Sequence, residues 1–393
     1  MKSFLSLVAL LLIVGAQAVP AHAQKASAAN LVPTPPMGWN SWNGFHKTVT
    51  DAIVRAQADA LVASGMKAAG YEYVNIDGGW QGTRDAQGVL HPNGGFPDMK
   101  ALAAYVHGKG LKIGIYSSPG PKTCGGFEGS YGHEEQDAKM FASWNMDFLK
   151  YDWCTAGTVY ERSEYPEVFR KMAVAIAHSG RPMVYSTHGI GPVWEYSTSV
   201  GANMWRTTAD IKDNYERMAM IGFGQNGLEK FAGPGHWNDL DMLEIGNGGM
   251  KDNEYRMHMS LWCLLAAPLL AGNDLTRMTP QTLEILTNPE VIAVDQDPAA
   301  IQGHRVQEEG PKVVMMKPMK DGSEAVGFFN REKGIVNITL KFSEIGMPED
   351  TSIRDLWQRK DLGDFHGSFS VDVPEHSVVL VRIRKAADSH GKR

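Results

Sequence analysis

Residues 147–154 read DFLKYDWC, a short apolar segment that contains Lys150 and reaches the carboxylate of Asp152. A short run of apolar and aromatic residues predicts a strand at residues 148–152. A carboxylate that closes such a strand is typical of the catalytic mouth of a barrel of parallel strands. Lys150 lies two residues before Asp152 on the same face of the strand, so we expect its ammonium group to keep Asp152 ionised.

A second carboxylate, Asp210, closes the run MWRTTAD at residues 204–210, four residues after Arg206. Two carboxylates that flank a sugar bond are sufficient for its hydrolysis, one as the nucleophile and one as the acid and base. The sequence therefore predicts cleavage of a glycosidic bond. The plainer alternatives are a helix-capping aspartate at position 152 and an ordinary ion pair between Arg206 and Asp210.

Short strand-like runs alternate with amphipathic segments through the first three quarters of the chain. The clearest strands are expected at residues 73–77, 111–116, 148–152, 183–186 and 203–206, and helices at residues 52–69, 99–109, 134–143 and 165–179. Such repeats indicate a parallel sheet, and polar residues at successive strand ends favour an α/β fold of the (β/α)8 TIM-barrel type over residues 31–300. An open, doubly wound sheet is the structural alternative.

The pattern changes after residue 297. Short strands are expected at residues 312–317, 324–330, 336–342, 352–357 and 377–383, separated by Gly, Pro and Asp turns. This texture predicts a C-terminal antiparallel β-sandwich domain at residues 306–384. Such a domain either binds polysaccharide or packs on the barrel, and packing is the favoured interpretation.

The N-terminal residues have the pattern of a secretory signal: Lys2, an apolar run at residues 4–16, and the small-residue cleavage motif AHA at residues 21–23. We therefore expect a signal peptide at residues 1–23 and a secreted or periplasmic protein; an uncleaved anchor is the alternative. The apolar run is too short to span a membrane. The formal net charge of −6 argues against a nucleic-acid or anionic-membrane partner, whereas a neutral carbohydrate would fit.

Several short motifs follow one another in a fixed order between residues 37 and 243. They are MGWNSW (37–42), NID (75–77), GIY (114–116), KYD (150–152), WR (205–206), WND (237–239) and DML (241–243). In this order they resemble glycoside hydrolase family 27, the melibiase or α-galactosidase family. The resemblance implies a retaining exo-glycosidase that removes terminal α-D-galactosyl residues without a metal or cofactor, with Asp152 as the nucleophile and Asp210 as the acid and base.

The resemblance also implies a set of sugar-binding residues: Trp42, Asp77, Tyr116, Lys150, Arg206, Asp241 and Met242. Buried carboxylates such as Asp77 and Asp241 accept hydrogen bonds from sugar hydroxyls. We expect Arg206 to hold a sugar hydroxyl rather than to neutralise Asp210, and Met242 to line the floor of the pocket. Trp42, Trp80 and Trp237 are expected to offer apolar faces to the ring.

Three cysteines are present. Cys124 and Cys154 follow strands that are neighbours in a parallel barrel, and the resemblance implies a disulfide between them. Cys263 lies in the apolar stretch LWCLL at residues 261–265 and is expected to be a buried free thiol. Metal binding is not expected, because no two of these cysteines share a close spacing with a histidine.

Two departures from the family pattern concern the sugar. Asp77 is followed by Gly78 and Gly79, where the family has a second aspartate and often a cysteine. After the strand at residues 183–186 the chain has STHGIG where a Cys-Glu-Trp string is common, so His188 either contacts the sugar's 2-substituent or is simply a loop histidine. Gly78 could occupy a backbone conformation that only glycine adopts freely.

These departures leave the sugar open. The alternatives to an α-D-galactoside are a β-L-arabinopyranoside or an α-glucan, and an alternative of another class is an inactive sugar-binding protein. The presence of both Asp152 and Asp210 argues against the inactive protein. The sequence gives no indication of the oligomeric state.

Overall fold

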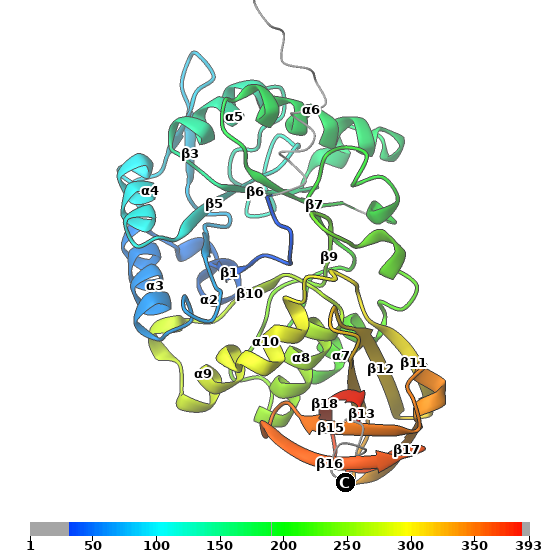
Figure 1. The fold of residues 1–393 in the computed structure, drawn as a ribbon. Helices are drawn as coiled ribbons and strands as arrows, with labels where there is room; N and C mark the ends of the chain where they lie inside the picture. The colour runs from blue at the N-terminus through cyan, green and yellow to red at the C-terminus, as the bar shows by residue number, and fades with distance from the viewer. Residues whose placement is uncertain (1–30, 190, 387–393) are drawn as a thin grey trace, which may run out of the picture.

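The computed structural model describes residues 31–189 and 191–386, and the predicted signal peptide at residues 1–23 lies outside them. Within the described part, eight parallel strands form one sheet in the order β10-β1-β2-β5-β6-β7-β8-β9 (Figure 1). The strands are β1 (Met37–Asn40), β2 (Tyr73–Asn75), β5 (Lys112–Ser117), β6 (Phe148–Asp152), β7 (Val184–His188), β8 (Met204–Arg206), β9 (Trp237–Asp239) and β10 (Leu269–Ala271). Leu243, after β9, pairs in parallel with Ala271 and closes the sheet. The predicted barrel is confirmed.

The helices lie outside the strands (Figure 1). They are α2 (Trp42–Phe45), α3 (Asp51–Ala63), α4 (Met99–Gly108), α5 (Glu134–Ser143), α6 (Tyr165–His178), α7 (Tyr215–Phe223), α8 (Asp252–Leu264), α9 (Pro280–Thr287) and α10 (Pro289–Asp295). Side-chain caps start several of them: the carboxylate of Asp98 accepts the amide of Ala101. The helix expected at residues 52–69 ends at Ala63, because Gly65 turns the chain at a φ of 87°.

The five strands expected for the barrel correspond to β2, β5, β6, β7 and β8. The remaining strands, β1, β9 and β10, contain only three or four residues each. Runs of this length are difficult to recognise by periodicity. A short hairpin, β3 (Gln81–Arg84) and β4 (Leu90–Pro92), follows β2, and Arg84 is anchored to Asp137 of α5 by an ion pair of 2.7 Å.

The C-terminal residues form the predicted β-sandwich. A six-stranded sheet has the order β11-β12-β13-β18-β15-β16, and a two-stranded sheet pairs β14 with β17. The strands are β11 (His304–Glu309), β12 (Lys312–Pro318), β13 (Glu324–Asn330), β14 (Val336–Lys341), β15 (Asp350–Asp355), β16 (Lys360–His366), β17 (Ser368–Val373) and β18 (Ser377–Lys385). Phe328, Leu340, Phe369 and Val381 meet in one buried cluster that joins the two sheets.

This second domain packs on the barrel through α7 and α8 (Figure 1). Asn253 of α8 donates to the carbonyl oxygens of Glu375 and His376 at 2.9 and 3.1 Å. The ring of His376 stacks on Tyr215 of α7, with the ring centroids 3.6 Å apart. Among the described residues, every helix is too short or too polar to cross a membrane.

Candidate active site

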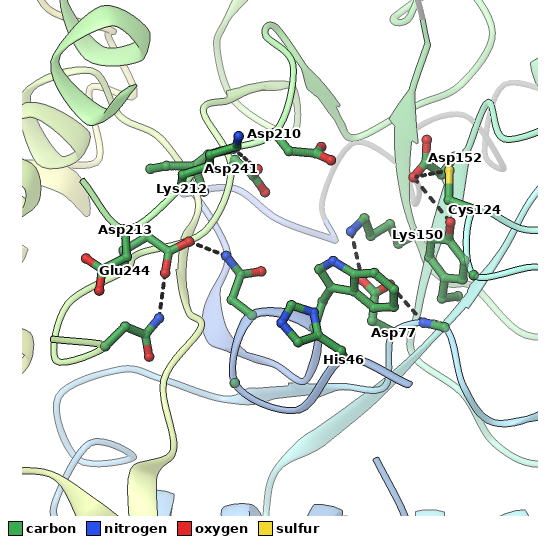
Figure 2. A pocket seen from close by; sticks show the side chains of 18 of the residues that line it. His46, Asp77, Cys124, Lys150, Asp152, Asp210, Lys212, Asp213, Asp241 and Glu244 are labelled. Atoms are coloured by element: carbon green, nitrogen blue, oxygen red, sulfur yellow. Dashed lines mark hydrogen bonds and ion pairs between the residues drawn. The ribbon is translucent and has the colours of Figure 1, made fainter. Parts of the chain in front are cut away.

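A cavity of about 710 Å³ opens at the C-terminal ends of the barrel strands. Figure 2 shows its side chains, which come from loops that are distant in the sequence. The expected residues that line it are Trp42, Asp77, Tyr116, Lys150, Asp152, Arg206, Asp210 and Asp241. Parallel strands present their carboxyl ends on one face, so the closing residues of several strands converge there.

Asp152 is the last residue of β6 and is held from two sides. The hydroxyl of Tyr116 donates to its Oδ2 at 3.2 Å. Nδ1 of His188, the residue opposite in β7, lies 3.1 Å from Oδ1 as an ion-pair contact, although its geometry is poor for a hydrogen bond. Burial would raise the pKa of Asp152, but His188, Lys150 and Arg206 together lower it to about 2. Asp152 is therefore ionised at neutral pH.

Lys150 contacts a different carboxylate from the one expected. Its Nζ donates to Oδ2 of Asp77 at 2.7 Å, and Nδ2 of Asn40 donates to the same oxygen at 3.1 Å. Burial lowers the pKa of Lys150, but the carboxylates of Asp77, Asp152 and Asp241 outweigh burial and raise it. The side chain thus stays charged. It acts on Asp152 through space, while His188 makes the direct contact.

Arg206 is buried between two carboxylates. Its Nη2 lies 2.9 Å from Oδ2 of Asp241 and 3.1 Å from Oδ1 of Asp210. The structure pairs Arg206 with Asp210, four residues later, which is the ion pair considered as the plainer alternative; the expected contact of Arg206 with a sugar hydroxyl stays a prediction. The Nε of Arg206 is buried without a hydrogen-bond partner.

Asp241 occupies a left-handed backbone conformation, with a φ of 78°. Its Oδ2 accepts the amide of Ile211 at 2.8 Å in addition to the contact with Arg206. Burial raises the pKa of Asp241, but Arg206 and Lys150 outweigh burial, and the net shift is downward. Non-glycine residues with this strained geometry occur often at functional sites. The fixed, charged carboxylate is suited to accept a hydroxyl.

Asp210 lies beyond β8, and its side chain is 75% exposed. Figure 2 shows that it reaches into the pocket from the side opposite Asp152. The structure thus brings together the two carboxylates that the sequence singled out. Asp152 is partly buried and ionised at the end of a strand, whereas Asp210 is exposed at the pocket.

Three of the expected sugar contacts are wrong. Trp80 and Trp237 are fully buried, and their indole nitrogens donate to the carbonyl oxygens of Tyr116 and Val32 at 3.0 and 2.9 Å. Met242 is 3% exposed and belongs to the hydrophobic core, so it does not line the pocket floor. Closeness in sequence to a strand end does not fix the direction of a side chain. Of the three tryptophans, Trp42 alone lines the pocket.

The two departures from the family pattern lie in different places. Gly78 lines the main pocket, where an added Cβ would be 3.5 Å from Tyr116 and 3.7 Å from Trp42. Its φ is outside the left-handed region, which is occupied by Gly79 at 119°, so the expectation of a glycine-only conformation at Gly78 is wrong. His188 lines an adjoining cavity of about 510 Å³ that shares Arg206 with the main pocket.

The predicted cysteine pattern is confirmed. Cys124 and Cys154 form a disulfide, and Cys263 is a buried free thiol. The bridge ties the loop after β5 to the end of β6, next to Asp152. Within the described chain, Cys124, Cys154 and Asp152 also form the one group of potential metal ligands. Because both sulfurs are joined to each other, neither is available as a thiolate ligand.

The sequence did not reveal a polar group at the far end of the pocket. The residues that line it are Asn43 of α2, Asp213 from the loop after β8, and Glu244 and Asn247 from the loop after β9. Burial raises the pKa of Glu244 to about 7, although Asn247 and Asn43 act to lower it. The one available signal was Glu244 and Asn247 in the polar run that follows the DML motif.

Comparisons with known proteins identify the family of this chain. A family model described as α-galactosidase A matches residues 34–297, and a model of the α-galactosidase C-terminal β-sandwich domain matches residues 309–383. α-Galactosidase A of Cellvibrio japonicus is 43% identical over 405 residues, which cover 96% of this chain and 97% of the relative.

Two solved structures extend the comparison. α-Galactosidase I from Mortierella vinacea has a TM-score of 0.86 and 34% identity, and the match covers 91% of this chain and 99% of that one. A β-L-arabinopyranosidase of family GH27 from Geobacillus stearothermophilus has a TM-score of 0.82 and 27% identity, covering 93% and 99%. The chain therefore belongs to the α-galactosidase A family of glycoside hydrolases, as the order of its motifs predicted.

Proposed function

We propose that this protein hydrolyses terminal α-D-galactosyl residues of oligo- or polysaccharides by double displacement, with retention at the anomeric carbon. The observation that carries the proposal is the pair of carboxylates across one cavity, with Asp152 partly buried and ionised and Asp210 accessible. The 43% identity to an α-galactosidase over nearly the whole chain supports the choice of sugar.

In the first step, a carboxylate oxygen of Asp152 forms a bond to the anomeric carbon as the bond to the leaving oxygen breaks. Asp210 donates a proton to that leaving oxygen. In the second step, water loses a proton to Asp210 and attacks the anomeric carbon, which releases Asp152. The contacts from Tyr116 and His188 orient Asp152 for the attack.

The floor of the pocket suits a neutral sugar with several hydroxyls. Asp77 and Asp241 are acceptors, while Lys150 and Arg206 are donors. Asp77 is paired with Lys150 and Asp241 with Arg206. Both carboxylates are thus already neutralised, and a bound ligand does not have to carry a positive charge. Trp42 supplies the apolar face.

Gly78 favours one second candidate, a β-L-arabinopyranoside, which is galactose without its hydroxymethyl group. The absence of a side chain at Gly78 removes a possible partner for a sugar hydroxyl, at a position where a Cβ would make ordinary contacts with Tyr116 and Trp42. A site with fewer polar contacts discriminates less between related sugars. The structure of the arabinopyranosidase shows that this fold hosts that activity.

We also propose that the protein is exported. The signal pattern at residues 1–23 supports this, and the Cys124–Cys154 disulfide fits an oxidising compartment. N-terminal sequencing of the secreted protein tests this proposal, and we expect the first residue to be Gln24. Retention of the full chain inside the cell would contradict it.

The function is tested with nitrophenyl derivatives of α-galactose, β-L-arabinopyranose, α-N-acetylgalactosamine and α-glucose. We expect the α-galactoside to have the highest kcat/KM, and proton NMR to show the retained anomer first. The Asp210→Ala variant should keep the first step for the nitrophenyl substrate, whose leaving group needs no proton, and azide should intercept the intermediate with net retention. An inverted first product would overturn both carboxylate roles, and no turnover of any substrate would favour the sugar-binding protein.

A further inference from the structure

Asp241 is the strained residue of the active site. Its φ of 78° lies in the left-handed region, and its side chain lines the cavity beside Arg206. A non-glycine residue stays in this region only where the surrounding structure holds it. The carboxylate is held by Arg206 and by the amide of Ile211, and the amide of Asp241 donates to Oδ1 of Asp239 at 2.8 Å. The carbonyl group of Asp241 needs a further partner.

Helix α8 supplies that partner. The indole N–H of Trp262 donates to the carbonyl oxygen of Asp241 at 2.9 Å. One turn earlier on the same face of α8, Nε2 of His258 accepts the amide of Glu244 at 3.1 Å. Trp262 and His258 are fully buried and lie behind the residues that line the cavity. The two side chains therefore hold both ends of the segment 241–244.

The two rings also support each other. The ring of His258 meets that of Trp262 edge to face, with the centroids 4.0 Å apart and an angle of 80° between the planes. Burial lowers the pKa of His258 to about 3, so the imidazole is neutral near neutral pH. A neutral imidazole has one acceptor nitrogen, and His258 uses it on the amide of Glu244.

Helix α8 is itself fixed from its other side. Nε1 of Trp357, in the C-terminal domain, donates to Oγ of Ser260 at 2.9 Å, and Asn253 at the start of the helix donates to the carbonyl oxygens of Glu375 and His376. The helix thus lies between the barrel and the C-terminal sheets (Figure 1). A helix that is held by both domains is a rigid base from which to position a residue of the pocket.

We propose that Trp262 and His258 are positioning residues for the reaction, which hold the segment 241–244 so that the Asp241 carboxylate faces the sugar. Neither side chain touches the substrate. Without the indole N–H, the buried carbonyl of Asp241 lacks its donor and the main chain relaxes from the left-handed region, which moves the carboxylate. This inference rests on the proposed function, because it takes Asp241 as an acceptor for a sugar hydroxyl.

The test is a double-mutant cycle with nitrophenyl α-galactoside as the substrate. Trp262→Phe removes the N–H donor and keeps an aromatic ring. We expect kcat/KM to fall about tenfold, since a buried carbonyl loses its partner. Asp241→Gly removes the carboxylate and also relieves the left-handed strain. In the Asp241→Gly background, Trp262→Phe has no carboxylate to misplace, so its further effect on kcat/KM should be below about twofold.

Trp237→Phe is the matched control. Trp237 is also fully buried, and its indole nitrogen donates to the carbonyl oxygen of Val32 at the same distance of 2.9 Å. Its loss should change kcat/KM by less than about twofold.

A second pair of variants tests His258. His258→Leu removes the acceptor for the amide of Glu244, so kcat/KM should fall several-fold, whereas His258→Gln offers a carbonyl oxygen in its place and should restore most of the activity.

The outcomes separate the two levels of the argument. If Trp262→Phe lowers kcat/KM by the same factor with and without the Asp241 carboxylate, its role is general to the fold and the inference is overturned, while the proposed function stands. Equal activity of His258→Leu and His258→Gln overturns the role of His258 in the same way. If Trp262→Phe fails to fold by circular dichroism, the pair at His258 decides. If the wild-type enzyme does not hydrolyse the galactoside, the proposed function fails and this inference fails with it.

Discussion

Two aspartates in this protein, Asp152, which is partly buried, and Asp295, which is fully buried, have opposite titration behaviour. At the mouth of the barrel, burial would raise the pKa of Asp152, but His188, Lys150 and Arg206 lower it to about 2. At the boundary between the domains, Asp295 ends α10 beside Lys317 of β12, and burial raises its pKa well above the ordinary value in spite of that lysine. Burial alone therefore does not set the charge of a carboxylate; the number and placement of the nearby cations do.

The contacts explain the difference. Lys317 donates to the backbone carbonyl of Asp295 at 3.3 Å, and Oδ1 of Asp295 is buried without a hydrogen-bond partner. Burial also lowers the pKa of Lys317 itself. Asp152, in contrast, faces a large cavity and is approached by a histidine and a tyrosine. Asp152 therefore stays charged. In the pair of Asp295 and Lys317, the cation only weakly offsets the burial of the carboxylate.

Removal of the Asp152 carboxylate at the mouth of the barrel should have the largest effect on activity. The Asp152→Asn variant lacks the carboxylate that we propose bonds to the anomeric carbon, so we expect kcat to fall by more than about 10⁴-fold, on the scale seen when a catalytic nucleophile is removed. Turnover of nitrophenyl α-galactoside is the measurement, with circular dichroism as the control for folding. Activity above about 1% of wild type in a folded variant would show that Asp152 is not the nucleophile.

Removal of Lys317 at the boundary between the domains should lower the stability of the protein rather than its activity. The Lys317→Met variant leaves a buried carboxylate without its cation, which costs about 3–5 kcal/mol when the carboxylate is ionised. Because the pKa of Asp295 is raised in the folded state, the folded protein keeps a proton that the unfolded chain loses, and stability falls as pH rises above about 4.

Urea unfolding at several pH values tests this prediction. The deficit of Lys317→Met should grow as pH rises above about 8, the raised pKa of Asp295, because only the wild-type carboxylate then ionises beside a cation. The double variant Lys317→Met/Asp295→Asn should recover much of it. A deficit independent of pH would mean that the loss comes from packing. At the mouth the sign is reversed: the stability that ionised Asp152 contributes is present above its ordinary pKa near 4 and is lost as pH falls towards 2.

Removal of His188, one of the cations beside Asp152, should shift the pKa of Asp152 upward, in the direction seen for Asp295. In His188→Gln, one of the charges that offset the effect of burial on Asp152 is lost. We therefore expect the pKa of Asp152 to rise by about one unit. The ratio of kcat/KM at pH 3 to that at pH 5 should then fall several-fold relative to wild type. Recovery of activity after return to pH 6 controls for acid denaturation. An unchanged ratio with a uniformly lower kcat would assign His188 a purely orienting role.

The smallest effect on activity is expected when a carboxylate is added to the pocket at position 78. Gly78→Asp restores a hydroxyl partner beside Tyr116 and Trp42, where a Cβ meets only ordinary contacts. We expect kcat/KM for the α-galactoside to rise several-fold relative to the other pyranosides, about 1 kcal/mol of transition-state binding. Gly78→Ala controls for the added volume. If the folded Gly78→Asp enzyme loses α-galactosidase activity while another sugar is the best substrate of the wild type, the galactose assignment is wrong.

The sequence by itself determined the barrel, the sandwich, the two carboxylates and the cysteine pattern. These features follow from local signals: alternating strand and helix periods, a polar residue at the end of an apolar strand, and motifs in a fixed order. Strand β6 was predicted with its exact bounds because its apolar run ends sharply at Asp152. Strands β1, β9 and β10 were missed, although β2 and β8, which also contain three residues each, were predicted.

The tertiary structure alone decided which side chains meet. Lys150 contacts Asp77, His188 contacts Asp152, and Trp80 turns inward against Phe141 of α5. Asn43 and Glu244 are 201 residues apart in the chain and share a hydrogen bond at the far end of the pocket. Such contacts depend on side-chain direction and on how loops from different strands converge, and neither is encoded in the spacing of residues along one segment.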